Sequence, residues 1–379
     1  MRKTIIIIVI ILCVIAIAVG VYFGWKNAQI ILNPSAPASQ QPISIQISTS
    51  TTPNEATNKK LEVVSDQPIF GYWIFSGATS SEAGVFYLGT DGKIFQVKGD
   101  GKDEAITSEP ILNVQAIKSS SDGSRVIIEY GDLNTPKFVI FNTAAKIFEL
   151  LPDDISAADF SPDAKKIAYL ETPTSTALSN LTIKDLVGSK SKTTKILSFN
   201  QKDFDLQWIS PEKIILTPKP SAFYSSSAWL VDIKNKTLTS LASEINGLII
   251  KYSASGKIGL QFSSQSYGTV GKLNLINDLG AIKANLDFMT LPEKCLVSEP
   301  QIYCAIPKNI PTKTVLPDDY LKKAVYFSDL FYQIDITQNS SLEIFAPTNS
   351  AIDAVDLKLI DGKLLFINRY DNKLYGLEL

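Results

Sequence analysis

The stretch FSPDAKKIAY, residues 160–169, joins two apolar runs through a short polar turn. Similar units are SDGSRVII (121–128), YSASGKIGL (252–260) and, in a degenerate form, WISPEKIIL (208–216). An apolar run, a polar turn and a second apolar run are typical of two antiparallel strands joined by a tight turn. Because the unit recurs along the chain, the sequence predicts a repeat architecture.

A second marker repeats with a similar period. Apolar runs that are expected to be strands end in Asn or Asp at Asn142, Asp185, Asp232, Asn274 and Asp335. Successive markers are 43, 47, 42 and 61 residues apart, and a four-stranded blade of a β-propeller takes about 40–45 residues. The pattern therefore predicts an all-β fold, a β-propeller, with an insertion in the longest interval.

Seven four-stranded blades fit the chain. The first covers residues 67–108, the next five begin near residues 111, 154, 203, 247 and 289, and the last covers 354–377. The last blade lacks an outer strand, which Leu61–Ser65 would supply, closing the ring without an exposed edge. Six or eight blades remain alternatives because the markers in the first and last blades are weak. A tandem of three β-sandwiches does not explain one polar turn per repeat.

The N-terminal segment predicts a membrane anchor. Thr4–Gly24 carries no charge over 21 residues, and about 20 apolar residues span a bilayer as a helix. Arg2 and Lys3 precede this run, so the positive-inside rule places the N-terminus in the cytoplasm. We expect residues 1–26 to be a single-pass signal anchor in the cell membrane. A cleaved signal peptide is the alternative, because Ala16–Ala18 resembles a cleavage site.

The chain divides into three regions by composition. After the expected transmembrane helix, residues 27–66 are rich in Ser, Thr, Pro, Gln and Ala, a composition that cannot bury a core and predicts a flexible linker. Residues 67–379 form the predicted propeller domain, which lies outside the cytoplasm. The linker would hold this domain clear of the lipid surface.

Two of the three cysteines are expected to form a disulfide. Cys295 and Cys304 flank Glu299-Pro300, and a hairpin centred on that pair places the two cysteines opposite each other, within disulfide reach. An oxidising extracytoplasmic compartment favours the bond. Two free thiols in a sheet are the alternative.

The unit FSPDAKKIAY resembles the repeat of TolB-like, WD40-like (PD40-type) propellers, also found in the N-terminal propellers of the dipeptidyl peptidase IV and prolyl oligopeptidase group. The turns at Ser121–Gly123 and Ser253–Gly256 match it less completely. The resemblance implies a propeller that binds partners in the bacterial envelope. The chain departs from the family in its expected anchor and in having no room for an added α/β domain or a following peptidase domain.

Composition excludes several kinds of chemistry. The formal net charge is −2, which gives no basic field for nucleic acid. The chain has no histidine, so a Ser-His-Asp or Cys-His catalytic group and a histidine metal site are excluded. No phosphate-binding or dinucleotide-binding motif occurs. We therefore predict no catalytic residue, no metal site and no cofactor from motifs.

Partner contacts are expected on the loops between the second and third strands of the blades. These loops are neutral and rich in hydroxyl groups, and they carry Phe223, Tyr224 and Tyr267. The insertion, from Pro307 to about Tyr326, adds further candidate partner-binding residues: Tyr320, Leu321, Lys322 and Lys323. The alternative is that Leu316, Tyr320 and Leu321 pack back onto the sheet as a plug.

These observations favour a non-catalytic, membrane-anchored scaffold that binds a protein or a glycan of the cell envelope. A purely structural spacer is another possibility. The alternative function is a hydrolase or lyase based on carboxylates at the central channel. Buried carboxylates that converge at the channel mouth would favour the enzyme, whereas a plugged or hydroxyl-lined channel would favour binding.

Overall fold

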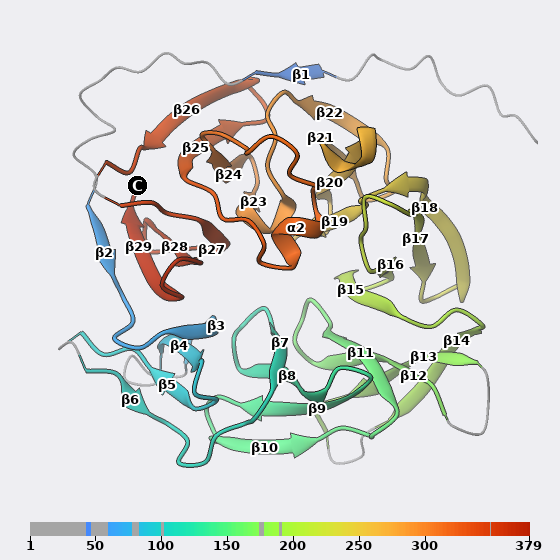
Figure 1. Ribbon diagram of the computed structural model, residues 1–379. Coiled ribbons are helices and arrows are strands. Elements are labelled where there is room, and N and C mark those ends of the chain that lie inside the picture. Colours follow the sequence, from blue (N-terminus) through green and yellow to red (C-terminus); the bar gives the residue numbers. More distant parts are fainter. Residues whose placement is uncertain are drawn as a thin grey trace, which may run out of the picture. The chain divides into compact units, whose positions relative to one another are not determined.

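Each predicted repeat forms one four-stranded antiparallel sheet, and seven such sheets are arranged in a ring (Figure 1). The computed structural model describes residues 43–46, 60–77, 83–99, 102–173, 178–188, 192–348 and 350–379. Within these ranges, the all-β seven-bladed propeller predicted from the repeat is confirmed.

The strands of the first four blades follow chain order. They are β3 (Ile69–Phe75), β4 (Gly84–Gly89), β5 (Ile94–Gln96) and β6 (Glu104–Ala105); β7 (Val114–Ser119), β8 (Arg125–Asp132), β9 (Thr135–Asn142) and β10 (Ile147–Leu150); β11 (Ile155–Phe160), β12 (Lys166–Glu171), β13 (Ser179–Asp185) and β14 (Thr193–Phe199); β15 (Phe204–Ser210), β16 (Lys213–Pro218), β17 (Ser225–Asp232) and β18 (Thr237–Asn246).

The remaining three blades include short helices. Their elements are β19 (Ile249–Tyr252), β20 (Ile258–Gln265), the 3₁₀ helix η1 (Ser266–Gly268), β21 (Val270–Asn277) and β22 (Ile282–Leu286); the 3₁₀ helix η2 (Pro292–Lys294), β23 (Cys295–Ser298), β24 (Gln301–Pro307), the helix α2 (Asp318–Leu321), β25 (Asp329–Asp335) and β26 (Ser340–Phe345); β27 (Ala354–Ile360), β28 (Lys363–Asn368) and β29 (Lys373–Glu378). In each blade the first of these strands lies nearest the centre of the ring (Figure 1).

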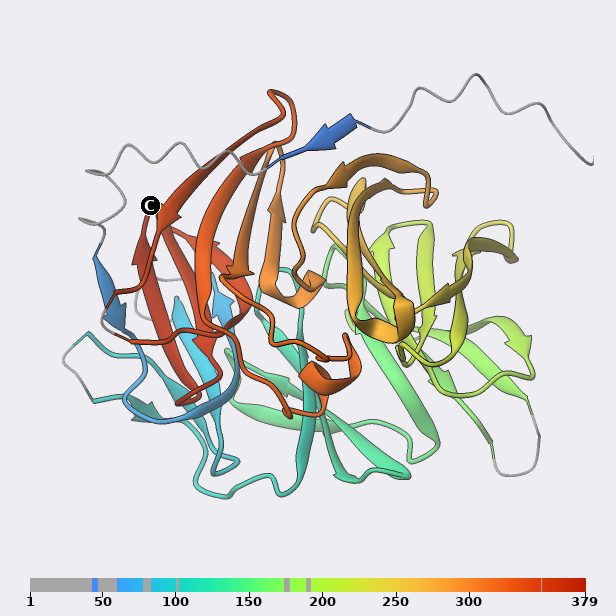
Figure 2. The same cartoon turned by 45° about the horizontal axis from the view of Figure 1, so that its top comes forward.

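The ring closes through a strand from the N-terminal side. Strand β2 (Leu61–Val63) pairs antiparallel with β29, with Leu61 opposite Leu377. The expectation that this segment completes the last blade is confirmed. A further strand, β1 (Ile43–Ile45), pairs parallel with β22 at the outer edge of the fifth blade, where Ile43 lies opposite Ala284 (Figure 2). The folded unit therefore extends into the range that composition assigned to the linker.

The turn between the first two strands of a blade explains the composition of the repeat. In the copy at residues 160–169, the Ser161 hydroxyl donates to Asp163 and accepts the N–H of Lys166. The short polar side chains thus form the hydrogen bonds that hold the turn. Gly123 has a φ of 66°. A Cβ atom there would lie 1.9 Å from the Ile74 carbonyl oxygen of the preceding blade, so only glycine fits.

The core lies between neighbouring blades. Trp73 of the first blade is fully buried, and its ring stacks on Phe86 and meets the edge of Phe141 in the second blade. The indole N–H donates to the Thr143 hydroxyl at 3.1 Å. Because each sheet is covered on both faces, its central strands carry continuous apolar runs.

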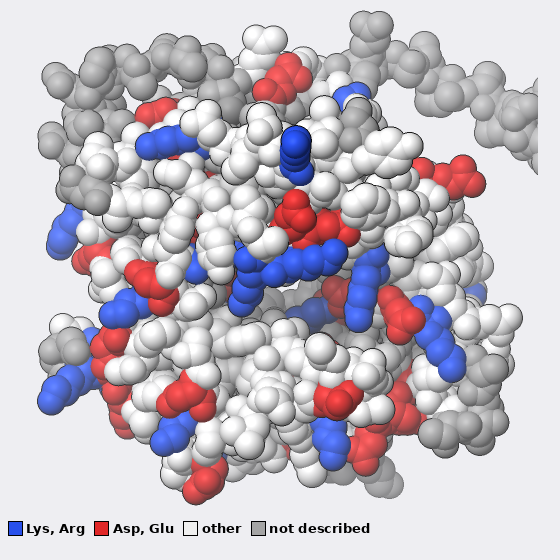
Figure 3. Space-filling view, viewed as in Figure 1, with Lys and Arg blue, Asp and Glu red and all other residues white. Residues whose placement is uncertain are grey.

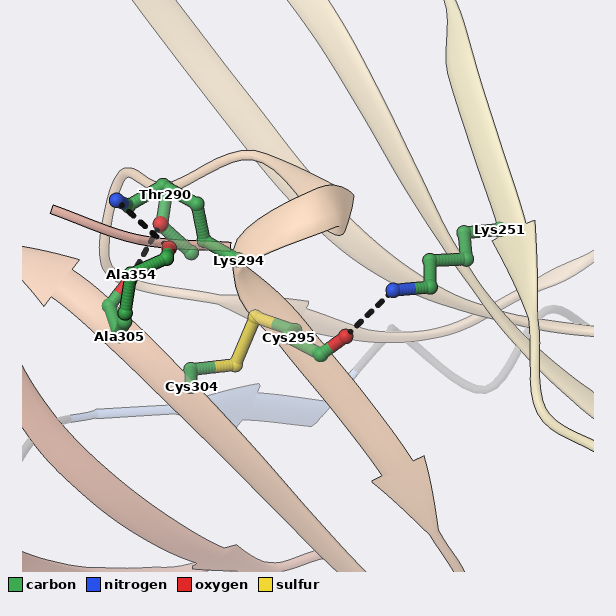
Figure 4. Close-up of a disulfide and its surroundings, with 7 residues drawn as sticks. All are labelled: Lys251, Thr290, Lys294, Cys295, Cys304, Ala305 and Ala354. Carbon is green, nitrogen blue, oxygen red and sulfur yellow. Dashed lines mark hydrogen bonds between the residues drawn. A yellow bond between two sulfur atoms is a disulfide. The ribbon is translucent and has the colours of Figure 1, made fainter. Parts of the chain in front are cut away.

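A disulfide joins the first two strands of the sixth blade. Cys295 in β23 lies opposite Cys304 in β24, as the hairpin pattern predicted, and their Cα atoms are 4.2 Å apart. The Cys295 carbonyl oxygen also accepts a hydrogen bond from Lys251 of the fifth blade at 3.0 Å (Figure 4). The disulfide is buried between blades rather than at the surface.

We expect both cysteines to resist thiol labelling until a reductant is added. The bond closes a loop with a sequence separation of only 9 residues, so removing it should lower the free energy of unfolding by about 2–3 kcal/mol and leave the propeller folded. Mass spectrometry after alkylation with and without reductant measures this. Full labelling of both residues without reductant would reject the bond.

No helix of the described residues is long and apolar enough to cross a membrane. The predicted transmembrane segment, Thr4–Gly24, lies outside those residues.

Candidate functional site

The innermost strands of the ring enclose a channel lined by ionisable side chains. Its wider part, a cavity of about 480 Å³, is bordered by the loops that carry Asn134 and Lys219 and by Leu321 of α2. A narrower part of about 400 Å³ lies among the inner strands. The polar and charged residues of the narrower part come from all seven blades: Tyr72, Lys118, Asp159, Asp205, Gln207, Lys251, Glu293, Asp356 and Lys358.

One side of the channel is formed by the second, third and fourth blades. Lys118 in β7 donates to Asp205 in β15 at 2.7 Å and to the Leu206 carbonyl oxygen at 2.8 Å. Asp159 in β11 accepts the N–H of Trp208 at 2.8 Å. Burial raises the pKa of Asp159 to about 6, although the charge of Lys118 opposes the change. This side therefore holds a carboxyl group that gains and loses its proton near neutral pH.

On the other side, Glu293 of η2 lines both parts of the channel. Its Oε2 atom is buried and has no hydrogen-bond partner among the described residues. Burial raises the pKa of Glu293, and the charge of Lys251 only partly opposes this. Burial also lowers the pKa of Lys251, against the charges of Asp356 and Glu293. Both changes favour the uncharged forms, so this pair is suited to exchange protons with a bound molecule.

The first and seventh blades complete the wall. Lys358 in β27 donates to Asp356 at 2.9 Å and to the Tyr72 carbonyl oxygen at 2.7 Å. The ammonium group also lies over the Tyr72 ring, 3.9 Å from its centre. Asp356 has a φ of 52°, a strained conformation for this residue within a strand. Lysines and carboxylates together thus line the channel wall.

The two residues after Glu293 fix its position in the chain. Glu293 faces the channel, Lys294 enters a buried ionic cluster, and Cys295 forms the disulfide. Figure 4 shows the Lys294 side chain pointing away from Lys251 toward the carbonyl of Ala354. Since the two residues that follow Glu293 are anchored, the backbone that carries Glu293 is held at the channel wall.

The buried ionic cluster joins Lys294 and Arg369 to two aspartates. Lys294 is fully buried and donates to Asp329 at 2.7 Å and to Asp353 at 2.5 Å. Arg369 donates to the second oxygen of Asp353 at 2.9 Å. The Tyr320 hydroxyl also donates to Asp353, at 2.8 Å. The cluster therefore ties η2, the insertion and the seventh blade together.

The structure places Tyr320, a candidate partner-binding residue, in the interior. Tyr320 is only 4% exposed, and the Arg369 guanidinium lies over its ring at 3.8 Å. Leu316 is buried as well, and its N–H donates to the Gly268 carbonyl oxygen. The insertion thus acts as a plug, because its apolar side chains are buried against the blades. Leu321 stays partly exposed at the channel mouth.

The other candidate partner-binding residues lie on the surface. Lys322 and Lys323 are exposed at the end of α2. The remaining candidates are also exposed, by 55%, 76% and 81% for Phe223, Tyr224 and Tyr267. The loops that carry these aromatic residues pack together, because a Cβ atom on Gly268 would lie 2.8 Å from the Ala222 side chain. The structure therefore gathers three of the predicted aromatic residues on one face.

The channel residues carry a sequence signal that motif analysis missed. Lys118, Asp159 and Lys251 each precede the left-handed residue of the repeat turn by five positions. A charged residue at one position in several inner strands identifies the side chains that face the centre of a ring. No motif marks Glu293, because η2 interrupts the repeat there.

No cluster of three or more Asp, Glu or Cys residues suited to a metal ion occurs within the described ranges. The ionisable groups of the channel instead form lysine–carboxylate pairs. Such pairs can donate and accept protons and can bind charged groups of a substrate.

No protein-family model matches the chain, and no curated protein matches it. Solved structures are similar in fold. An oligogalacturonate lyase from Vibrio parahaemolyticus matches with a TM-score of 0.58 and 11% identity over 85% of this chain and 94% of its own. The tricorn protease matches with a TM-score of 0.52 and 12% identity over 84% of this chain. This chain spans only 34% of the tricorn protease. TolB from Acinetobacter baumannii matches with a TM-score of 0.38 and 18% identity, over 52% of this chain and 49% of TolB.

The resemblance to TolB-like propellers is confirmed as a likeness of fold. The prediction of a non-catalytic scaffold, and with it the prediction that the chain is not an enzyme, is wrong. That prediction relied on the missing catalytic motifs and on the analogy with scaffold propellers. Two solved propellers of similar fold are a lyase and a protease, and the channel assembles carboxylates that no motif reveals.

We expect Asp159 to titrate with a midpoint near pH 6, measured by carboxyl-carbon NMR on selectively labelled protein. Replacing Lys118 by methionine should raise this midpoint further, because it removes the charge that stabilises the carboxylate. Asp335, a half-exposed carboxylate that accepts hydrogen bonds from Thr337, has a pKa lowered to about 2 and serves as the control.

The same shift links stability to pH. The folded state holds the Asp159 proton more tightly than the unfolded chain, so the contribution of this group to stability is lost as the pH rises from 3.8 to about 6. A midpoint at or below pH 4 in the NMR titration of Asp159 would contradict a buried, charge-paired carboxyl group at this position.

Proposed function

We propose that the protein is an enzyme that cleaves a polar substrate by general acid–base catalysis in its central channel, as a hydrolase or a lyase. The observation that carries the proposal is Glu293, whose buried Oε2 atom faces the channel without a partner and beside Lys251. A buried carboxyl group with an open oxygen is costly to the fold, and it is found where a bound molecule completes its hydrogen bonding.

The channel offers a proton donor in the sixth blade and a proton acceptor in the fourth. Burial raises the pKa of Glu293, which favours the protonated form that donates a proton to the leaving oxygen of the substrate. The Asp205 carboxylate, held by Lys118, accepts a proton from water in a hydrolysis or from carbon in an elimination. In either reaction Glu293 loses one proton and Asp205 gains one. Proton exchange with solvent then returns both groups to their starting forms.

Fold similarity adds a specific substrate to test. One solved propeller of similar fold is named an oligogalacturonate lyase, so oligogalacturonates belong in the substrate panel with neutral oligosaccharides and peptides. The full chain, purified in detergent, is incubated with each compound, and the products are identified by mass spectrometry. Hydrolysis adds the mass of one water to the products, whereas elimination does not.

The expected result is cleavage of at least one compound by the wild-type protein and none by Glu293→Gln. Equal cleavage by both proteins, or no cleavage of any panel member at any pH from 5 to 8, would overturn the proposal.

We also propose that the propeller lies outside the cytoplasm, held at the cell membrane by an N-terminal anchor. The uncharged run Thr4–Gly24, preceded by Arg2 and Lys3, supports this orientation. A protease added to intact spheroplasts should release a fragment that begins between Asn27 and Gln67. Complete protection of the propeller from the added protease would reject this topology.

A further inference from the structure

One phenol lies between two carboxyl groups near the point where the ring closes. The Tyr87 hydroxyl in β4 is 2.6 Å from Asp103 and 3.0 Å from Asp66. Asp66 lies between β2 and β3, whereas Asp103 directly precedes β6. Tyr87 is fully buried and its ring stacks on Phe95, so the hydroxyl group is fixed between the two carboxyl groups.

The two contacts of the phenol need more than one proton. A phenol has a single proton to donate. Burial and the hydrogen bond to Asp103 raise the pKa of Tyr87 far above neutral, so the phenol itself stays protonated. If both carboxyl groups were ionised, one of the two oxygen–oxygen contacts would have no proton and two acceptors would face each other. Both contacts are therefore hydrogen bonds only when one carboxyl group is protonated.

Backbone hydrogen bonds hold the two aspartates against each other. The Asp66 N–H donates to Asp103 at 2.9 Å, and the Asp103 N–H donates to Asp66 at 3.3 Å. Asp103 also accepts the Lys98 N–H at 3.2 Å. Two segments that are 37 residues apart in the sequence are thus joined through their carboxyl groups.

The pKa values of the two aspartates move in opposite directions. Burial raises the pKa of Asp103 and the hydrogen bond to Asp66 raises it further, against the hydrogen bond from Tyr87. Burial would also raise the pKa of Asp66, but its hydrogen bonds to Asp103 and Tyr87 outweigh burial and lower it. Two carboxyl groups that share one proton behave in this way.

Other charged side chains around the clasp site have contacts of their own. Figure 3 shows acidic and basic side chains side by side over much of the face that it presents. The charged residues of the segments that meet here are Glu62, Lys98, Lys102, Glu104, Lys363, Asp371 and Lys373. Lys98 pairs with Glu104 at 3.0 Å, and Glu62 pairs with Lys363 at 2.5 Å.

The backbone next to Asp66 closes the ring. The Ser65 hydroxyl accepts the Leu374 N–H of β29 at 3.0 Å, and the Val64 N–H donates to the Leu374 carbonyl oxygen at 2.8 Å. Residues 64–66, the closing segment, therefore connect the seventh blade with the two carboxyl groups of the first.

We propose that Asp66, Tyr87 and Asp103 form a pH-sensitive clasp, which holds the junction between the first and seventh blades while the two carboxyl groups share a proton. When the shared proton is lost, two charged carboxylates face one phenol, and their repulsion loosens the closing segment. The channel wall depends on the same junction, since Lys358 of the seventh blade donates to the Tyr72 carbonyl oxygen of the first at 2.7 Å.

The sign of the pH effect follows from the proton. The folded state holds the Asp103 proton more tightly than the unfolded chain does. This contribution to stability is complete below the ordinary aspartate pKa of 3.8 and is lost as the pH rises through the raised pKa. The contribution of Asp66, whose pKa is lowered, is present above 3.8 and is lost only at lower pH. The clasp therefore loosens as the pH rises.

Carboxyl-carbon NMR on aspartate-labelled full chain in detergent tests the shared proton directly. Asp103 should titrate with a midpoint above 3.8. Asp66→Asn should lower this midpoint, because it removes the carboxylate that accepts the proton. The wild-type titration does not depend on the folding of any variant, and a wild-type midpoint at or below 3.8 would overturn the proposal.

Hydrogen–deuterium exchange of the same protein measures how firmly the closing segment is held. Protection of the peptide 61–69, corrected for intrinsic exchange rates, is compared at pH 4 and pH 7. It should fall roughly tenfold for each unit by which the Asp103 midpoint exceeds 3.8. Asp103→Asn, which cannot lose a proton, should keep its protection, whereas the control Asp91→Asn, in the exposed turn between β4 and β5, should behave as wild type. An equal fall in wild type and Asp103→Asn would reject the clasp.

Discussion

Replacing Lys294 by methionine is expected to lower the free energy of unfolding by about 3–5 kcal/mol. Lys294 is fully buried, and its ammonium group pairs with Asp329 and Asp353, which are also fully buried. Without it, two carboxyl groups share a site in which Arg369 is the remaining cation. The Oδ1 atom of Asp329 already lacks a partner, so the cluster has no spare donor to compensate.

Urea unfolding followed by tryptophan fluorescence measures this loss. The matched control is Lys322→Met, because Lys322 has a side chain that is 71% exposed and only a 3.9 Å contact to Asp318, and such exposed pairs contribute about 0–1 kcal/mol. If both variants unfold at the same urea concentration, the buried cluster does not stabilise the sixth and seventh blades.

Lys294→Met should also loosen the channel. Because η2 carries Lys294 directly after Glu293, release of the lysine frees the segment that holds the carboxyl group. Any activity that depends on Glu293 should fall more than the unfolded fraction explains.

Glu293→Gln should lower turnover by about 10²–10⁴-fold, which is the usual contribution of a positioned acid or base. Glutamine keeps the shape and the hydrogen-bonding ability of the side chain but has no acidic proton to transfer to the substrate. Stability should change little or rise slightly, because the variant removes a buried carboxyl group whose pKa is raised by desolvation. A loss of activity without loss of stability separates a catalytic role from a structural one.

The control for this prediction is Glu212→Gln, in the exposed turn between β15 and β16. It should match the wild-type protein in both measurements. The pH dependence adds a further test: activity that needs protonated Glu293 should persist to a higher pH than the ordinary pKa of a glutamate allows, since burial raises its pKa. An activity that is retained in Glu293→Gln would assign the proton donor to another group.

Part of the channel lining could be predicted from the sequence. Lys118, Asp159 and Lys251 occupy one position of the repeat, so their convergence follows once the ring is known. Glu293 and Lys294 could not be placed in this way. They lie in η2, where the chain departs from the repeat. No sequence pattern indicates which of these two adjacent charged residues faces the channel and which is buried in the core.

The insertion gives the clearest case of a decision made by packing. Sequence marked it as an interruption of strand periodicity, and both a recognition loop and a plug were consistent with Tyr320 and Leu321. In the structure Tyr320 is buried beneath Arg369 and bonded to Asp353, whereas Leu321, one residue later, borders the channel. Arg369 and Asp353 lie in the seventh blade, far along the chain, so local pattern carries no information on these contacts.

The architecture of this protein follows from its repeat. A turn of Ser, Asp and Gly between apolar runs is compatible with few structures other than a tight hairpin. Its recurrence at the length of a blade predicts the ring and the closing strand. The hairpin pattern also predicts the register that pairs Cys295 with Cys304. The chemistry of the channel, in contrast, depends on contacts between distant segments. The site is made of one or two side chains from each of seven blades, and the pKa values of Asp159 and Glu293 are set by burial and neighbouring charges, which exist only when distant segments meet.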